Sequence, residues 1–430
     1  MIKSLSILWH YAQAQRNFRR WPDRATLERW QEQQVQRHFA WVRQRSFYYA
    51  GLAEGGDWRR IPVQNKAGLM GHFQQWNTAS ISLEEASQTA EHAERTRDFS
   101  ATLRGLTVGL SSGTSGSRGI FLASAAERHR WAGVLLARCL QGTLAQPHRA
   151  ALFLRADSTL YQSLGSRRIS FSFFDLLLPM AAYAERLRAL QPTLLAAPPA
   201  VLVALARLPG AADMVAPPAL VLSVADVLDA AEREEIEAAF GTRVGQLYQA
   251  TEGFLAATCP QGALHWNEDN IVVQKAWLDE GRTHYYPVIT DFRRTTQPMI
   301  RYQMDDVIAE PEHPSCPCGS VFGVLGAIAG RKDDVLQLAA LEGGKSTAIF
   351  PDFVRRAIVL GAPAGVEYRV RQSAPSHWDI FLSDLSAAPA VSAEVGLLCR
   401  ELRVQEPALH FSPWSPEPLI HKQRRVQCLI

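Results

Sequence analysis

Residues 107–119 form a turn-like segment built mostly of glycine and small hydroxyl side chains. Such a segment exposes backbone N–H groups and hydroxyls that can surround phosphate oxygens, because glycine permits the positive φ angles that a nest of N–H groups needs. It is not a Walker A motif, since no Gly-Lys-Ser/Thr closes it, and it is not a G-x-G-x-x-G turn with an acidic partner. These residues alone leave a flexible linker as the alternative. The apolar residues 120–122 that follow favour a phosphate site.

Three of the six cysteines and one histidine form a second chemical group. Cys259 and His265 have a Cys-x5-His spacing, and Cys316 and Cys318 lie roughly 50 residues further on, one residue apart. Three thiolates and an imidazole can form a closed tetrahedral zinc site, which would be structural. The spacing is not that of a standard zinc finger. A pair of buried thiols with a Cys-Pro-Cys-Gly turn is the alternative.

The other cysteines have no neighbours that suggest nucleophilic catalysis; they are Cys139, Cys399 and Cys428. The sequence also contains no Gly-x-Ser-x-Gly elbow and no His-Glu-x-x-His motif. We therefore treat these cysteines as packing or surface residues.

The elements that must position these groups follow an α/β pattern. Residues 1–95 carry apolar side chains at spacings of three and four, which predicts a helical N-terminal segment. Between 105 and 330, short apolar runs such as 150–154 and 219–223 alternate with helical stretches such as 229–240. This alternation is typical of an α/β sheet with crossover helices.

The C-terminal part of the chain reads differently. Between 262 and 310 the pattern predicts strands at 271–274 and 285–289 with few helices. After 330 we expect a small α/β unit with a helix at 349–360, strands at 367–370 and 377–382, and loops at 360–365 and 386–392. The predicted domains are therefore residues 1–330, in which 96–330 form the core that contains the candidate phosphate segment, and a small C-terminal domain of residues 331–430.

Composition limits the class of protein. The 430 residues are 47% hydrophobic, and 45 Lys+Arg against 42 Asp+Glu leave a net charge of +3. That charge is too small and too evenly spread to indicate nucleic acid as a main ligand. The N-terminus lacks a long apolar h-region, and no apolar run reaches the roughly 20 residues of a membrane-spanning helix. We predict a cytoplasmic protein without a membrane partner.

Four motifs in a fixed order give the sequence a specific resemblance. The glycine-rich segment is similar to the phosphate loop of the adenylate-forming superfamily, in particular of phenylacetate–CoA ligase, the adenylyltransferase of the deazaflavin coenzyme and CapK-like enzymes. Residues 248–253, 301–306 and 330–334 resemble its aromatic-x-x-Thr-Glu, Arg-Tyr-x-Thr-Gly-Asp and Gly-Arg-x-Asp-Asp motifs. Weaker matches at residues 62–66 and at Lys422 extend the likeness to most of the chain. The fold it implies is α/β, with a large N-terminal adenylate-forming domain of mixed sheets and a small mobile C-terminal α/β domain.

The resemblance implies a nucleotide site for ATP and AMP. The phosphate-loop residues are Ser111, Ser112, Gly113, Thr114, Ser115, Gly116 and Arg118. Thr251 would lie near the α-phosphate and Glu252 would bind Mg²⁺, which neutralises phosphate charge while pyrophosphate leaves.

Other implied contacts involve the nucleoside. Asp306 would accept the two ribose hydroxyls, and Tyr248 would stack on adenine. Ser223 and Ala225 occupy the place where the family contacts the base. Each of these residues has an ordinary alternative. Tyr248 would be a core residue, Ser223 and Ala225 would form a strand-end turn, and the Asp pair that includes Asp306 would cap a turn.

Three further roles come from the same resemblance. Arg331 would reach the nucleotide, and Asp333 would be the hinge about which the small domain rotates. Lys422 would bridge carboxylate and phosphate oxygens during adenylation, although a basic C-terminal run is often only solvated. The branch often carries similar Cys and His residues, which supports zinc at Cys259, His265, Cys316 and Cys318.

The sequence departs from the wider pattern in two places. Arg118 and Gly119 follow Ser117, where Pro and Lys or Thr are usual, so Arg118 would supply the cation. Met304-Asp305 replaces the usual Thr-Gly. These departures put the substrate class in doubt more than the use of a nucleotide.

The preferred hypothesis is ATP- and Mg²⁺-dependent activation of a carboxylic acid as its acyl adenylate, followed by transfer to a thiol of coenzyme A or a carrier protein. An aromatic acid pocket would be lined by Trp131, Phe171, Phe173 and Phe174, which are equally compatible with core positions. Adenylylation of a hydroxyl group is the second hypothesis. A non-catalytic nucleotide-binding subunit is the third hypothesis. The sequence leaves open whether the protein forms a homodimer.

Overall fold

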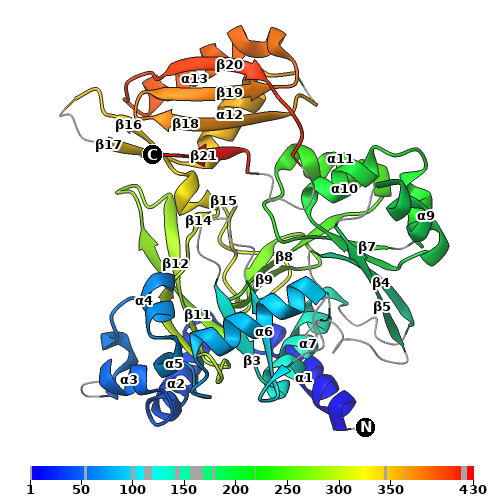
Figure 1. Cartoon of the computed structure of the whole chain (residues 1–430), viewed down its shortest axis with the longest axis vertical. Coiled ribbons are helices and arrows are strands. Elements are labelled where there is room, and N and C mark those ends of the chain that lie inside the picture. Colours follow the sequence, from blue (N-terminus) through cyan, green and yellow to red (C-terminus); the bar gives the residue numbers. More distant parts are fainter. Residues whose placement is uncertain are drawn as a thin grey trace. The chain divides into compact units, whose positions relative to one another are not determined.

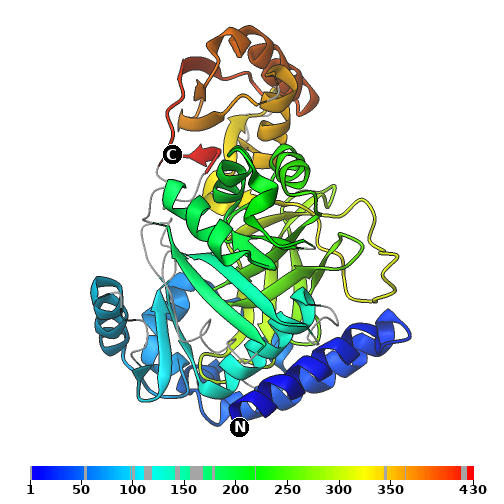
Figure 2. The same cartoon turned by 90° about the vertical axis from the view of Figure 1, so that its right-hand side faces the viewer.

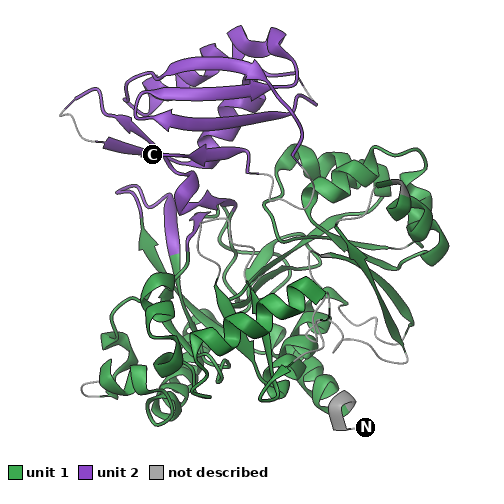
Figure 3. Cartoon of the chain, in the orientation of Figure 1, with its two compact units in different colours: residues 1–277, 287–304, 310–326 green, residues 278–286, 305–309, 327–430 purple. Residues whose placement is uncertain are grey.

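The computed structural model describes residues 2–52, 56–96, 98, 102–110, 119–140, 146–154, 168–176, 180–217, 219–342, 346–363, 365–417 and 424–430. The chain divides into two compact units (Figure 3). Unit 1 contains residues 1–277, 287–304 and 310–326, and unit 2 contains residues 278–286, 305–309 and 327–430.

Unit 1 begins with helices, as the sequence predicts. In the longest of them, the side chain of Asp23 caps the N-terminus by accepting a hydrogen bond from the backbone N–H of Thr26. Leu27, Val35 and Phe39 recur on one face of this helix and are fully buried. The helical elements are α1 (Ile2–Arg19), α2 (Arg24–Arg43), α3 (Phe47–Leu52), η2 (Trp58–Arg60), α4 (Lys66–Gly71), α5 (Phe73–Trp76) and α6 (Leu83–Thr96).

A small antiparallel sheet follows and flanks the glycine-rich segment. It has the strand order β1-β2-β3, and the pair Leu110↔Ile120 joins the last residue of β2 to the first residue of β3. The strands are β1 (Thr102–Leu103), β2 (Leu106–Leu110) and β3 (Ile120–Ala123).

A seven-stranded sheet forms the centre of unit 1 (Figures 1 and 2). Its order is β10-β9-β8-β7-β6-β4-β5; the pairs from β5 to β8 are parallel, and β9 and β10 are antiparallel. The strands are β4 (His148–Leu154), β5 (Ile169–Asp175), β6 (Leu194–Ala197), β7 (Leu220–Val224), β8 (Val244–Ala250), β9 (Gly253–Thr258) and β10 (Leu264–Trp266). The predicted strands at 150–154 and 219–223 are confirmed by β4 and β7.

Helices connect β5 to β6, β6 to β7 and β7 to β8, as parallel strands require, and α7 precedes β4. The predicted helix at 229–240 is α11, whose N-cap is Asp229. The helices are α7 (Ala125–Cys139), α9 (Met180–Leu190), α10 (Pro199–Ala206), η3 (Ala211–Met214) and α11 (Ala230–Phe240). Helix α7 packs closely on α1, since a Cβ placed on Gly133 would lie 2.5 Å from the Cβ of His10.

Three further strands are β11 (Ile271–Trp277), β12 (His284–Asp291) and β13 (Met299–Gln303). Strand β12 contributes to both units. In unit 2 its first residues pair with β14 (Asp306–Ala309), and in unit 1 its last residues pair with β13. The strands predicted within 262–310 are therefore present.

Unit 2 has its own core around a four-stranded sheet of order β20-β19-β18-β21. Helices α12 and α13 pack on the face that carries Val370, Trp378 and Ile380. The elements are β15 (Ile328–Arg331), η4 (Lys332–Asp334), β16 (Leu336–Ala339), β17 (Ser346–Ile349), α12 (Pro351–Gly361), β18 (Tyr368–Ala374), β19 (His377–Leu382), η5 (Leu385–Ala387), α13 (Ala388–Glu401), β20 (Ala408–Pro413) and β21 (Val426–Cys428).

The prediction of a loop at residues 386–392 is wrong. These residues form the end of η5 and the first turn of α13. Proline is tolerated in a first helical turn because the N–H that it lacks has no partner there. The proline in this run therefore marks a helix start.

Among the described residues, no helix is both long enough and apolar enough to cross a membrane.

Candidate nucleotide site and cysteine–histidine cluster

The predicted nucleotide-binding residues of unit 1 lie at the carboxyl ends of neighbouring parallel strands. Ser223 is near the end of β7, and Tyr248 is near the end of β8. The two strands are in register through the pairs Ser223↔Gln246 and Val224↔Leu247. The carboxyl edge of an open parallel sheet is where α/β proteins bind ligands.

Thr251 and Glu252 form the two-residue turn between β8 and β9, because Ala250 pairs with Gly253. The Thr251 hydroxyl donates a hydrogen bond to Oε2 of Glu252 at 2.9 Å, and the Tyr302 hydroxyl donates to Oε1 at 2.9 Å. Each carboxylate oxygen has a second lone pair for a cation. The half-buried Glu252 carboxylate is therefore oriented from both sides and still able to bind a metal.

A segment far away in sequence, residues 61–64, holds Tyr302 and its neighbours in place. Gln64 forms a parallel bridge with Tyr302; its N–H donates to Arg301 O at 2.8 Å, and its carbonyl accepts from the N–H of Gln303 at 2.9 Å. The Arg301 guanidinium donates to Ile61 O at 2.7 Å. The structure thus brings the weak motif at residues 62–66 next to the motif that contains Tyr302.

Ser223 and Ala225 form an unusual turn. Ser223 is 2% exposed, and its hydroxyl has no hydrogen-bond partner among the described residues. Ala225 has φ of +69°, a left-handed conformation that costs an L-residue roughly 1–2 kcal/mol. An unpaired buried hydroxyl beside a strained residue fits a turn that contacts a polar ligand.

Tyr248 is buried and packs against Trp266, with 6.0 Å between ring centroids. On the same strand, Oε1 of Gln249 accepts a hydrogen bond from the indole N–H of Trp131 at 3.1 Å. Trp131 and Phe171 are partly buried against one apolar cluster, whereas Phe174 is fully buried and stacks on Phe153. Phe174 is therefore a core residue.

Unit 2 contains the remaining described candidates for the nucleotide site. Asp306 and Arg331 are paired across β14 and β15, and Arg331 Nε lies 3.8 Å from Oδ1 of Asp306. A second guanidinium nitrogen of Arg331 lies 3.6 Å from Asp305. Asp333, the predicted hinge, is exposed.

Asp334 and Arg424 form a buried ion pair in unit 2. Arg424 Nε lies 2.7 Å from Oδ1 of Asp334, whose other oxygen accepts from the Arg331 N–H at 2.8 Å. Burial raises the pKa of Asp334 above its ordinary value, although Arg424 opposes the shift. Sequence reasoning missed this pair, and the only signal was the arginine two positions after Lys422.

Eight predicted site residues lie outside the described residues: Ser111, Ser112, Gly113, Thr114, Ser115, Gly116, Arg118 and Lys422.

The cysteines and histidine that the sequence grouped lie together in unit 1. Ligand atoms of Cys259, His265, Cys316 and Cys318 are all within 4.8 Å of one another. The Cys259 and Cys316 sulfurs are 3.6 Å apart, and Cys318 Sγ lies 3.4 Å from Nε2 of His265. Tetrahedral zinc bonds imply ligand separations of roughly 3.8 Å for two sulfurs and 3.6 Å for sulfur and nitrogen. The donor set and its spacing therefore fit zinc.

The surroundings of His265 also suit a metal ligand. Its Nδ1 is 2.8 Å from the carbonyl oxygen of Phe322, which assigns the N–H to Nδ1 and leaves Nε2 facing the sulfurs. Burial lowers the pKa of His265 and raises that of the Cys318 thiol to about 12. A bound cation would favour the thiolate, because ligand thiols bind metals deprotonated.

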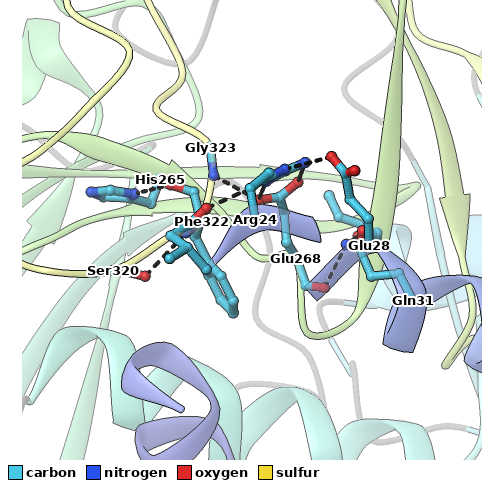
Figure 4. A network of polar contacts seen from close by, with 10 residues as sticks. Arg24, Glu28, Gln31, His265, Glu268, Ser320, Phe322 and Gly323 are labelled. Carbon is cyan, nitrogen blue, oxygen red and sulfur yellow. Dashed lines mark hydrogen bonds and ion pairs between the residues drawn. The ribbon is translucent and has the colours of Figure 1, made fainter. Parts of the chain in front are cut away.

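A polar network around the buried Glu268 supports this cluster (Figure 4). The backbone N–H of Gly323 donates to Oε2 of Glu268 at 2.6 Å, and Arg24 donates to Oε1 at 2.7 Å. The amide of Gln31 donates to the Glu268 carbonyl at 2.8 Å. Helix α2 therefore braces the segment that carries Phe322 and Gly323.

Sequence reasoning also missed polar residues between β12 and β13. Arg294 donates to the carbonyl oxygen of Thr251, and Gln297 is fully buried. The only signal was a polar run directly before the motif of residues 301–306.

Comparison with solved structures places the fold among known enzymes. A 2-hydroxyisobutyryl-CoA ligase in the postadenylation state aligns over 96% of this chain and 91% of its own, with 17% identity and a TM-score of 0.63. The amide bond synthetase McbA from Marinactinospora thermotolerans aligns over 74% of this chain and 68% of its own, with 13% identity and a TM-score of 0.53. No protein-family model and no curated protein matches the sequence.

Proposed function

We propose that this chain, which has the fold of the acid–CoA ligases of the adenylate-forming superfamily, activates a carboxylic acid with ATP and transfers the acyl group to the thiol of coenzyme A. The observation that carries the proposal is the Glu252 carboxylate, which Thr251 and Tyr302 orient at the carboxyl edge of the parallel sheet. The unpaired hydroxyl of Ser223 at the same edge supports a nucleoside ligand.

In the first half-reaction, a carboxylate oxygen of the acid attacks the α-phosphorus of ATP. The new bond joins oxygen and phosphorus, and the bond to the bridging oxygen breaks as pyrophosphate leaves. Glu252 would hold Mg²⁺, which neutralises charge on the leaving group. The Thr251 hydroxyl would donate to an α-phosphate oxygen once it turns away from Glu252.

From unit 2 the proposal takes Asp306 as acceptor for the ribose hydroxyls and Arg331 as the cation that reaches the nucleotide. The glycine-rich residues 111–118 and Lys422 are also part of the proposed nucleotide site, and their assignment rests on the resemblance alone. We also propose Asp333 as the hinge residue, at a domain boundary near residue 330.

In the second half-reaction, the thiolate of coenzyme A attacks the acyl carbon and AMP leaves with the bonding electron pair. The product is a thioester. Adenylation of the carboxylate therefore supplies the free energy for forming the thioester.

An aromatic or large apolar acid is the proposed substrate class. Trp131 and Phe171 are partly buried on one face of the sheet, and the Trp131 indole is fixed to Gln249, two residues before Thr251. Flat apolar side chains favour an aromatic acid by stacking. The proposal also includes a structural zinc ion at the cysteine–histidine cluster. This ion would cross-link Cys259 and His265, in the β9–β10 hairpin, to residues 316–318.

The test is a product assay with ATP, Mg²⁺, coenzyme A and a panel of aromatic and aliphatic acids, read by mass spectrometry. The proposal expects AMP and one acyl-CoA in equal amounts. AMP formed with phenols or alcohols and never with acids would replace it with hydroxyl adenylylation.

A further inference from the structure

The segment of residues 292–298, between β12 and β13, contacts the Thr251–Glu252 turn and strand β3, which follows the predicted phosphate-loop residues. Gln297 is 0% exposed, and its amide nitrogen donates to Ile120 O at 2.9 Å. Its amide oxygen accepts from the backbone N–H of Leu122 at 3.1 Å. Both partners belong to β3, which begins just after the phosphate-loop sequence and pairs with β2 before it.

Arg294 extends this contact to the metal-binding turn. One guanidinium nitrogen donates to Thr251 O at 2.5 Å, and the other donates to Oε1 of Gln297 at 2.8 Å. The planar fork of an arginine holds two acceptors in a fixed geometry, which a lysine cannot do. A continuous chain of hydrogen bonds therefore joins β3 to the Thr251–Glu252 turn.

The segment is itself held in place by two half-buried carboxylates, those of Asp291 and Glu127. Oδ1 of Asp291 accepts from the backbone N–H of Arg294 at 3.1 Å. Oε1 of Glu127, in the capping box of α7, accepts from the N–H groups of Thr295 and Thr296 at 2.6 and 2.8 Å. Burial alone would raise the pKa of Glu127, but these hydrogen bonds hold it below its ordinary value, so the anchor stays ionised.

We propose that Arg294 and Gln297 are positioning residues that fix the spacing between β3 and the Thr251–Glu252 turn, and thereby set the affinity for the triphosphate of ATP. The proposal rests on the proposed function, because it needs both regions to face the same nucleotide. Neither side chain has to touch ATP. Their effect passes through the carbonyl of Thr251 and the backbone of β3.

Arg294→Lys tests the proposal because it keeps the charge and loses the fork. The matched control is Arg293→Lys, since the neighbouring guanidinium packs over the rings of Trp30 and Phe292 and makes no contact with Thr251. The measurements are the Kd for ATP with Mg²⁺ and the separate KM values for ATP and for the acid. We expect Arg294→Lys to raise the Kd and KM for ATP about 10-fold, as loss of a charged hydrogen bond implies, and to change the KM for the acid less than 2-fold.

Gln297→Glu provides a second variant in case Arg294→Lys fails to fold. It keeps the acceptor for Arg294 and Leu122 and loses the donor to Ile120, so we expect a smaller rise of about 3-fold in the Kd for ATP. A merely structural role would lower the melting temperature and the active fraction without changing either ATP constant. If the wild type and both variants bind ATP equally well, this proposal is wrong and the proposed function still stands. If the wild type has no measurable affinity for ATP, the proposed function is wrong as well.

Discussion

The hydroxyl of Tyr302 donates a hydrogen bond to Oε1 of Glu252 at 2.9 Å, across 50 residues of sequence. Because Tyr302 lies on β13 and Glu252 lies in the β8–β9 turn, the contact orients the proposed magnesium ligand from a separate strand. A carboxylate that is held in one orientation loses less entropy when it binds a cation.

Tyr302→Phe removes this hydrogen bond without changing the shape of the ring. We expect the adenylation rate to fall about 10-fold and the Mg²⁺ concentration for half-maximal rate to rise, because one hydrogen bond to a charged group is lost. Titration of Mg²⁺ at saturating ATP measures both. Tyr183→Phe is the control, since the Tyr183 hydroxyl donates to the carbonyl oxygen of Asp175 and not to Glu252. Equal Mg²⁺ requirements for wild type and Tyr302→Phe would contradict the assigned role.

Arg424→Ala should destabilise unit 2, because it leaves the buried Asp334 without its counter-charge. We expect a loss of about 3 kcal/mol in the free energy of unfolding. Removing Arg424 raises the pKa of Asp334 further, so the loss is absent near the unfolded pKa of 3.8 and grows as the pH rises. Urea denaturation at pH 5 and pH 8 measures the difference.

The matched control for this ion pair is the exposed pair of Arg400 and Glu406, at 3.3 Å. Arg400→Ala should cost less than about 1 kcal/mol at either pH, because exposed pairs contribute little. Similar losses for the two variants would show that burial of Asp334 carries no special cost.

His38 should make stability depend on pH below neutrality. Burial, together with the positive charge of Arg293, lowers the pKa of His38 to about 4, and its Nε2 makes no hydrogen bond to the described residues. The unfolded chain binds a proton near pH 6.5 and the folded chain does not, so this contribution is full above pH 6.5 and is lost as the pH falls toward 4.

His38→Gln should therefore reduce the difference in unfolding free energy between pH 7 and pH 5 by about 2 kcal/mol. Urea midpoints at both pH values measure it, and exposed His92→Gln is the control. An unchanged pH difference in His38→Gln would contradict the lowered pKa.

The cysteine–histidine cluster predicts bound zinc. We expect elemental analysis to find about one zinc ion per chain, and Cys316→Ser to lose it together with thermal stability. Cys428→Ser should keep the zinc, since Cys428 belongs to unit 2 and is not one of the four cluster residues. Metal-free protein that melts at the same temperature with and without added zinc would contradict a structural metal.

Much of the fold follows from local sequence patterns. The runs at 150–154 and 219–223 are strands, the helix near 229–240 begins at an Asp cap, and the fold implied by the four motifs is confirmed by the similar structures. The segment at 386–392 was mispredicted because its small residues and proline suit both a loop and a first helical turn.

The contacts that orient the candidate site could not be predicted in the same way. Gln297 reaches β3 across more than 170 residues, and Gln64 bridges to Tyr302 from the N-terminal segment. Periodicity reports which face of an element is buried, whereas these partners depend on how the sheets and loops pack. The cysteine–histidine cluster was predictable because three cysteines and a histidine at these spacings are a common set of zinc ligands.

The central claim is carboxylate adenylation, and acid-dependent exchange of labelled pyrophosphate into ATP tests it most directly. The account predicts exchange with at least one aromatic or large apolar acid, with a loss of about 100-fold in Glu252→Gln, since removing one charged group at the reacting phosphate costs that much. Lys422→Ala should abolish the same exchange. Exchange that proceeds equally in Glu252→Gln, or that depends on a phenol or alcohol and never on an acid, would contradict the account.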